Sequence, residues 1–191
     1  ARFVLLGSAS PTLVRGISES LAGRAHFIEM GGFGLDEVGA KNQSRLWVRG
    51  GFPRSFLAAN TERSLEWRED FMRAFLERDL PLLGVRVAPE SLRRFWMLLA
   101  HSHGQIWNGA ELARAMGVTQ PVARHYLDLL IGTFMVRQLK PWFENVSKRQ
   151  VKSPKIYLRD SGLLHALLGV STREELLGRP QLGASWEGFA I

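Results

Sequence analysis

The chain has 191 residues, 46% of them hydrophobic, which is enough to bury one large core or two small ones. It contains no cysteine, so disulfides and thiolate metal sites are excluded, and no apolar run approaches the roughly 20 residues that span a bilayer. With 25 Lys and Arg against 18 Asp and Glu, the net charge is +7. No signal peptide opens the chain, so we expect a cytoplasmic protein with no membrane partner.

The chain begins with a strand, helix, strand pattern. Residues 2–8 (RFVLLGS) are a continuous apolar run, which is typical of a strand buried on both faces. Ser10 and Pro11 then supply a cap and a first helical residue, and Gly23 ends the helix. Residues 25–30 are the second expected strand. Such a unit belongs to a parallel sheet, and nothing downstream looks able to supply its further strands.

A connection and a long helix come next. Glycines between residues 31 and 39 predict a flexible connection, and residues 50–53 (GGFP) predict a turn. A helix is expected from Asn60, because apolar side chains recur at helical spacing on one side of it. Its other side is charged and includes Arg68. Pro81 should end this helix.

The best-formed motif is a helix-turn-helix between residues 109 and 133. Gly117 supplies the corner between two helices, and Thr119 can cap the second of them. The inward positions of both helices carry apolar or small residues. Pro89 opens a preceding helix, which would be the first of three. The outward positions of the second helix are Gln120, Arg124, His125 and Asp128.

A basic two-stranded wing is expected after this motif, with strands over residues 134–139 and 155–158. Between residues 140 and 159 the chain carries six cations against a single acid, Glu144, and aromatic residues lie among them. Such a focused basic patch favours nucleic acid, most simply duplex DNA, as the partner. A solvated hairpin whose lysines deter edge pairing is the alternative. The candidate DNA-binding residues are Gln120, Arg124, His125, Lys140, Lys148, Arg149, Lys152 and Lys155.

Other groupings predict no catalytic or metal site. His101 and His103 lack a further ligand at metal spacing and are typical of a solvated helix end. Asp160, Ser161 and His165 could suggest nucleophilic catalysis, but the first two are more simply caps of a short helix over residues 160–168. A last helix should begin at Trp186.

Several segments resemble one known family. They are VLLGSAS, ISESLAGR, GGFP, FLERDLP, LARAMGVTQPVARHYLDLL, KSPKIYLRDSGLLHALLG and LGASWEGF. In this order they resemble the bacterial and archaeal ATPases that join an AAA+ type P-loop domain to a domain called DUF4143.

The resemblance implies a mixed α/β, mostly helical chain in four parts. Residues 1–38 would be the end of the ATPase sheet, and residues 39–88 a linker with a helical segment. Residues 89–160 would be the winged helix-turn-helix, and residues 161–191 the start of a nuclease-like domain. Glu187 resembles the first acid of that domain, although a surface role is the simpler reading.

The resemblance also implies roles for two residues near the start. Ser8 would be the polar sensor near the γ-phosphate, and Arg24 an arginine finger that reaches a neighbouring subunit of a homo-oligomer. The parent protein would use ATP and Mg, but the phosphate-binding loop lies upstream, so this chain alone should not hydrolyse ATP. From the residues alone, Ser8 starts a turn and Arg24 is a helix-end charge. A DNA-binding regulator without catalysis and a protein-interaction module stay open as alternatives.

Overall fold

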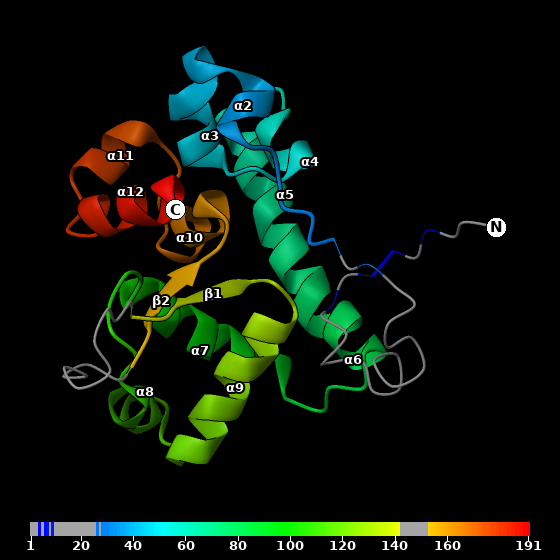
Figure 1. The fold of residues 1–191 in the computed structure, drawn as a ribbon, viewed down its shortest axis with the longest axis vertical. Coiled ribbons are helices and arrows are strands. Elements are labelled where there is room, and N and C mark those ends of the chain that lie inside the picture. The colour runs from blue at the N-terminus through cyan, green and yellow to red at the C-terminus, as the bar shows by residue number, and fades with distance from the viewer. Residues whose placement is uncertain (1–3, 5, 8, 10–25, 27, 142–152) are drawn as a thin grey trace.

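The structure, a computed structural model, describes residues 4, 6, 7, 9, 26, 28–141 and 153–191. These residues form a mixed α/β fold that is mostly helical and contains a two-stranded sheet (Figure 1). The sheet lies between α7, α8 and α9 on one side and α10 and α12 on the other (Figure 1).

The elements before the sheet, in chain order, are α2 (Leu35–Val38), a 3-10 turn η1 (Ala40–Asn42), α3 (Gln43–Arg49), α4 (Pro53–Phe56), α5 (Thr61–Ala74), a π-helical stretch η2 (Phe75–Asp79), α6 (Leu80–Leu82), α7 (Pro89–His101), α8 (Gly109–Met116) and α9 (Gln120–Gly132). The strands and the elements after them are β1 (Val136–Leu139), β2 (Lys155–Leu158), α10 (Ser161–Leu167), α11 (Arg173–Leu177) and α12 (Leu182–Ala190).

The long helix begins where the sequence predicts. The Asn60 side chain accepts a hydrogen bond from the Arg63 backbone N–H at 2.9 Å and so caps α5. Pro81 does not end the helical run, which passes through η2 and stops at Leu82. Pro81 follows the π-helical stretch and lies one residue before the helical run ends.

The predicted helix-turn-helix segments are confirmed as helices. Gly117 ends α8 in the left-handed conformation, with φ 69°, and the Val118 N–H bonds to the Ala113 carbonyl at 3.0 Å. Thr119 takes the N-cap position of α9, although its side chain makes no capping hydrogen bond. The inward side chains of both helices are buried as expected: Leu112, Ala113, Met116, Ala123, Leu127 and Leu130.

Strand β2 is paired on both sides. On one side it runs antiparallel to β1, with Val136 opposite Leu158 and Leu139 opposite Lys155. On the other side Ile106 forms an isolated bridge to Lys155, and the Trp107 N–H donates to the Pro154 carbonyl at 2.8 Å. The short segment before α8 therefore acts as a third strand next to the predicted pair.

One hydrophobic core runs through the described residues, from Trp47 in α3 to Leu176 in α11. Phe95 and Trp96 of α7 lie at its centre and are fully buried. The core continues across the expected boundaries at residues 88/89 and 160/161, so the parts on either side share buried contacts. The four-part division itself stays a prediction.

Two expectations for the first third of the chain are wrong. Val4, Leu6, Ile28 and Met30 were expected in buried strands, but each is more than 80% exposed and none belongs to a strand. No strand among the described residues lies beside them to supply ladder hydrogen bonds. The glycines between residues 31 and 39 were expected to form a flexible connection, yet Leu35–Val38 forms the short helix α2 among them.

No helix among the described residues is both long enough and apolar enough to cross a membrane.

Candidate nucleic-acid interface

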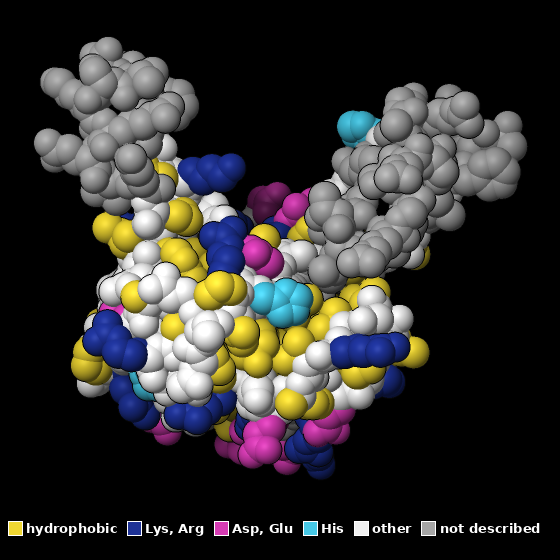
Figure 2. Space-filling model, turned by 90° about the horizontal axis from the view of Figure 1, so that it is seen from below, with side chains coloured by type: hydrophobic (Ala, Val, Ile, Leu, Met, Phe, Trp, Pro, Cys, Tyr) yellow, Lys and Arg dark blue, Asp and Glu magenta, His cyan; other side chains and the backbone are white. Residues whose placement is uncertain are grey.

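The outer face of α9 presents the three expected polar residues to solvent. Gln120, Arg124 and His125 are all exposed, because the apolar residues between them turn toward the core. Figure 2 looks at the molecule from the side where α8 and α9 lie. It shows Lys and Arg side chains at separate places on this face, with hydrophobic side chains between them and acidic side chains both near the middle and along the lower margin.

Arg124 already has an acidic partner. Its Nε lies 3.0 and 3.1 Å from the two carboxylate oxygens of Asp128, one helical turn further along α9. Both side chains are about half exposed, and such pairs contribute only about 0.3–0.5 kcal/mol. Asp128 therefore reduces the positive charge of this face without holding Arg124 firmly.

The predicted wing residues fall into two groups. Lys140 is exposed just after β1, and Lys155 lies in β2. Lys148, Arg149 and Lys152 lie outside the described residues, and so do Ser8 and Arg24.

Lys155 and Tyr157 both bond to one carboxylate oxygen of Glu187 on α12. The Lys155 Nζ lies 2.7 Å from Glu187 Oε1, and the Tyr157 hydroxyl lies 2.6 Å from the same atom. These hydrogen bonds lower the pKa of Glu187, the one from Lys155 most, and the bond to Glu187 raises the pKa of Lys155. Burial raises the pKa of Tyr157. Sequence reasoning missed this cluster, because 32 residues separate Glu187 from Lys155.

His103 lies beside this cluster and is buried, so the expectation of a solvated pair with His101 is wrong for it. Its Nδ1 accepts a hydrogen bond from the Leu158 N–H at 3.0 Å, and its Nε2 has no hydrogen-bond partner among the residues that the structure describes. A Cβ at Gly188 would overlap His103 Nε2, so α12 approaches the ring closely there. Burial lowers the pKa of His103 to about 4.

His165 joins α3, α10 and α12 through a second buried cluster. Its Nδ1 lies 3.1 Å from the Val48 carbonyl, which can only accept, so Nδ1 carries the proton. Its Nε2 then accepts from the Ser185 hydroxyl at 2.7 Å, and Ser185 in turn accepts from Trp47 Nε1 at 3.0 Å. Burial lowers the pKa of His165 to about 4.

Asp160, Ser161 and His165 do not assemble as a catalytic group. The Asp160 carboxylate accepts from the Leu163 and Gly51 backbone N–H groups, each at 2.8 Å, so it caps α10 and fixes the preceding turn. The capping interpretation is thereby confirmed for Asp160. No group of three or more potential metal ligands occurs within the described ranges.

Arg68 was assigned to the charged side of its helix, but it is fully buried. Its Nη1 donates to the Gly162 carbonyl at 2.8 Å and its Nε to the Ser64 carbonyl at 3.1 Å, which joins α5 to α10. Burial lowers the pKa of Arg68 to about 10, and the nearby Asp160 carboxylate opposes that shift.

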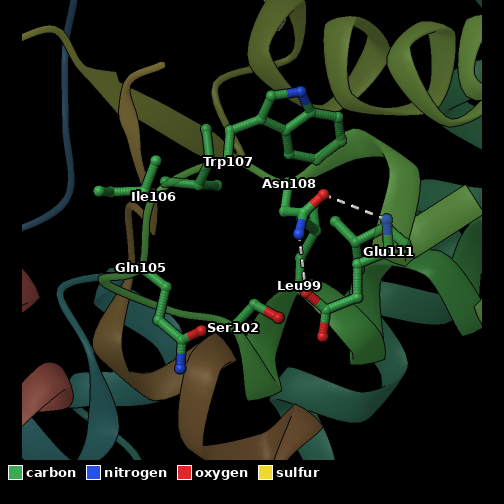
Figure 3. A pocket seen from close by; sticks show the side chains of 9 residues that line it. Leu99, Ser102, Gln105, Ile106, Trp107, Asn108 and Glu111 are labelled. Atoms are coloured by element: carbon green, nitrogen blue, oxygen red, sulfur yellow. Dashed lines mark hydrogen bonds between the residues drawn. The ribbon is translucent and has the colours of Figure 1, made fainter. Parts of the chain in front are cut away.

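A small pocket lies between the end of α7, the segment after it and the start of α8. Figure 3 shows Leu99, Ser102 and Gln105 along its walls, and Asn108 bonded to Glu111 at the start of α8. Its volume of about 20 Å³ has room for a single water molecule. It is too small to be a ligand site.

The chain belongs to the family described as a domain of unknown function, DUF8612, whose sequence pattern matches residues 40–174. It is 55% identical over all 191 residues to uncharacterised proteins of Mycobacterium bovis and Mycobacterium tuberculosis. The chain spans 43% of the length of each of these relatives. No solved structure matches it significantly.

This assignment corrects the resemblance drawn from the sequence. The family is DUF8612 and not the ATPases that carry DUF4143, and nothing in the relatives' descriptions indicates an AAA+ protein. The GGFP segment, for example, is a glycine and proline turn signal, which indicates a local conformation and not a family. The implied roles of Ser8 and Arg24, the use of ATP and Mg, and a homo-oligomer stay untested predictions.

Proposed function

We propose that residues 89–160 are a winged helix-turn-helix, and that the chain uses it to bind duplex DNA with little sequence preference. Three helices followed by an antiparallel pair, with a further short paired segment after the first helix, are the parts that such a domain needs. The observation that carries the proposal is the outer face of α9, where Gln120, Arg124 and His125 are exposed while the opposite face is buried.

Charge supports a phosphate-dominated contact. The chain carries +7, and most of that excess lies between residues 140 and 159, next to α9 in sequence. Neutralising phosphates releases condensed counterions, so such a patch binds any duplex at low salt.

We expect few hydrogen bonds between the protein and the edges of the DNA bases. Gln120, Arg124 and His125 are the candidate donors to base edges on α9, and Arg124 is paired with Asp128. A helix that offers so few donors positions the protein more than it selects a sequence.

Fluorescence anisotropy with two unrelated labelled duplexes, titrated at several salt concentrations, tests the proposal. If about four phosphates are neutralised, the logarithm of affinity should fall with the logarithm of salt at a slope of about −3 to −4. Replacing Lys148, Arg149 and Lys152 together with alanine should weaken binding to both duplexes alike and flatten the slope by about 2 to 3.

The matched control removes the same charge elsewhere, through alanine at Arg63, Arg73 and Arg78, which are exposed on α5 and η2. This control should change the slope far less. Absence of binding at about 50 mM salt, where such contacts are strong, would contradict the proposal, as would equal effects of the two triple variants.

A protein-interaction module is the second candidate, and the Arg124–Asp128 pair favours it, because that pair neutralises the middle of the outer face. Duplex binding that is absent or indifferent to the wing variants would make it the better account.

A further inference from the structure

Two hydrogen-bond donors of β2 converge on one point. Lys155 and Tyr157 are two residues apart in a strand, so their side chains lie on the same face of the sheet. Their Nζ and hydroxyl groups meet at a single oxygen atom, Oε1 of Glu187. An ammonium and a phenol aimed at the same acceptor form a small anion-binding arrangement.

The arrangement is rigid on one side and open on the other. Tyr157 is only 1% exposed, and its ring packs edge-on against His103 with centroids 5.3 Å apart, so its hydroxyl is held in place. The side chains of Lys155 and Glu187 are 42% and 44% exposed, and their hydrogen bond is only partly buried, so this side of the arrangement borders solvent.

Only the Glu187 side chain needs to move for this point to become free. The backbone of α12 is fixed separately, because Ser185 bonds to His165 and Trp47 in the core. Rotating one half-exposed carboxylate leaves those bonds intact.

The position suits a backbone phosphate. Lys155 begins β2 directly after the basic connection, and its cross-strand neighbour Leu139 precedes the exposed Lys140. A phosphate oxygen resembles a carboxylate oxygen in charge and in accepting charge-assisted hydrogen bonds.

We propose that Lys155 and Tyr157 form a subsite for a DNA backbone phosphate, which the Glu187 carboxylate fills when DNA is absent. This inference rests on the proposed function. Glu187 is then an internal competitor that lowers the affinity of the wing, and DNA binding displaces its side chain.

A double-mutant cycle in the anisotropy titration tests this. Glu187→Gln should raise duplex affinity about threefold or more and steepen the salt slope by about 0.9, because no displaced carboxylate then takes up a cation as the phosphate releases one. Lys155→Met alone should change affinity less than about twofold, because Lys155 is already neutralised by Glu187. In the Glu187→Gln background, Lys155→Met should cancel the gain.

Glu174→Gln is the matched control, since it removes the same charge from an exposed position on α11. A Glu187→Gln affinity equal to that of the unmodified chain or of this control would overturn the inference, and so would a gain that survives Lys155→Met. Circular dichroism and the thermal midpoint establish that each variant folds. If Glu187→Gln does not fold, Glu187→Ala carries the same test, because it also removes the carboxylate.

Two further arms separate the causes of failure. One outcome is salt-dependent binding that is lost in the Lys148, Arg149 and Lys152 variant but is unaffected by Glu187→Gln. That outcome would contradict the subsite and support the proposed function. If no variant binds duplex DNA, both the subsite and the proposed function are contradicted. Inorganic phosphate, compared with chloride at equal ionic strength, should not remove the Glu187→Gln gain; if it does, the subsite takes free phosphate rather than the DNA backbone.

Discussion

Arg68 shows how one buried side chain holds elements together. It bonds to the carbonyls of Ser64 and Gly162, and within the described part of the chain its Nη2 has no hydrogen-bond partner. Burying a guanidinium costs desolvation free energy. Arg68 offsets this cost through its hydrogen bonds to carbonyls of α5 and α10, which also fix how these two helices lie against each other.

We predict that Arg68→Ala lowers the free energy of unfolding by about 3–5 kcal/mol, because it removes the buried hydrogen bonds that join α5 to α10 and opens a cavity. Urea unfolding, followed by circular dichroism, measures the change. Arg63→Ala on the exposed side of the same helix should stay within about 0.5 kcal/mol. Equal effects of the two substitutions would show that Arg68 is not a structural link.

Arg68 also shows a limit of sequence reasoning at the residue scale. Helical spacing assigned Arg68 to the charged side of α5. The spacing carries no information on which other helix packs against that side, so the contact with α10 could not be predicted. The link between Lys155 and Glu187 had no local signal either, since it depends on where α12 packs.

At the scale of elements, two glycines serve different purposes. Gly117 has φ 69°, and a Cβ there would meet nothing within 4 Å, so only its backbone conformation requires glycine. Gly162 lies in α10 with an ordinary φ, but a Cβ there would overlap the Arg49 carbonyl. The first glycine makes a corner, and the second permits close packing of α3 on α10.

We predict that Gly117→Ala costs about 1 kcal/mol of unfolding free energy, since one residue is forced into the left-handed region. Gly162→Ala should cost more than about 3 kcal/mol, because backbone must shift to relieve the overlap. Gly183→Ala in α12 is the control: with open space around it, it should be neutral or stabilising by up to about 1 kcal/mol. Chemical denaturation ranks the three, and a Gly162→Ala variant as stable as Gly117→Ala would refute the packing argument.

The elements that the sequence predicted well have strong local signals. The helices α7, α8 and α9 have regular apolar spacing with glycine or proline at their ends, and the paired strands β1 and β2 flank a segment whose sequence is basic. The helices between residues 35 and 56 were missed because glycine and proline there suggest turns, whereas tertiary packing of Trp47 and Phe56 stabilises short helices. The helix α11 is short and had no clear period.

At the scale of the whole molecule, two buried neutral histidines contact α12 and help to hold it against the core. His165 bonds to Ser185, and His103 lies against Gly188. Burial keeps the folded pKa of both near 4, below the ordinary value of 6.5. Below about pH 6.5 the unfolded chain therefore takes up these protons before the folded chain does.

We predict that the contribution of these two histidines to the free energy of unfolding is fully present above about pH 6.5. Each histidine should then lower that free energy by about 1 kcal/mol between pH 7 and about pH 5.5. The loss should stop growing once the pH falls below about 4. Urea unfolding across this range measures it, and His103→Asn and His165→Asn should each reduce the slope. His125→Asn, at an exposed position, should leave the pH dependence of the unfolding free energy unchanged. The carboxylates contribute equally in every variant, so differences between variants report on the histidines alone. Identical slopes in all four proteins would contradict this account.

The pairing of Leu139 with Lys155 fixes the two ends of the basic segment that joins the strands. Because the ends are held by the sheet, doubling the length of that segment would cost only about 0.6 kcal/mol of loop closure. Its length and charge can therefore drift over generations with little penalty to folding. Natural selection can change the charge of this segment while the core stays the same, and an engineer could insert a different segment between the same two residues.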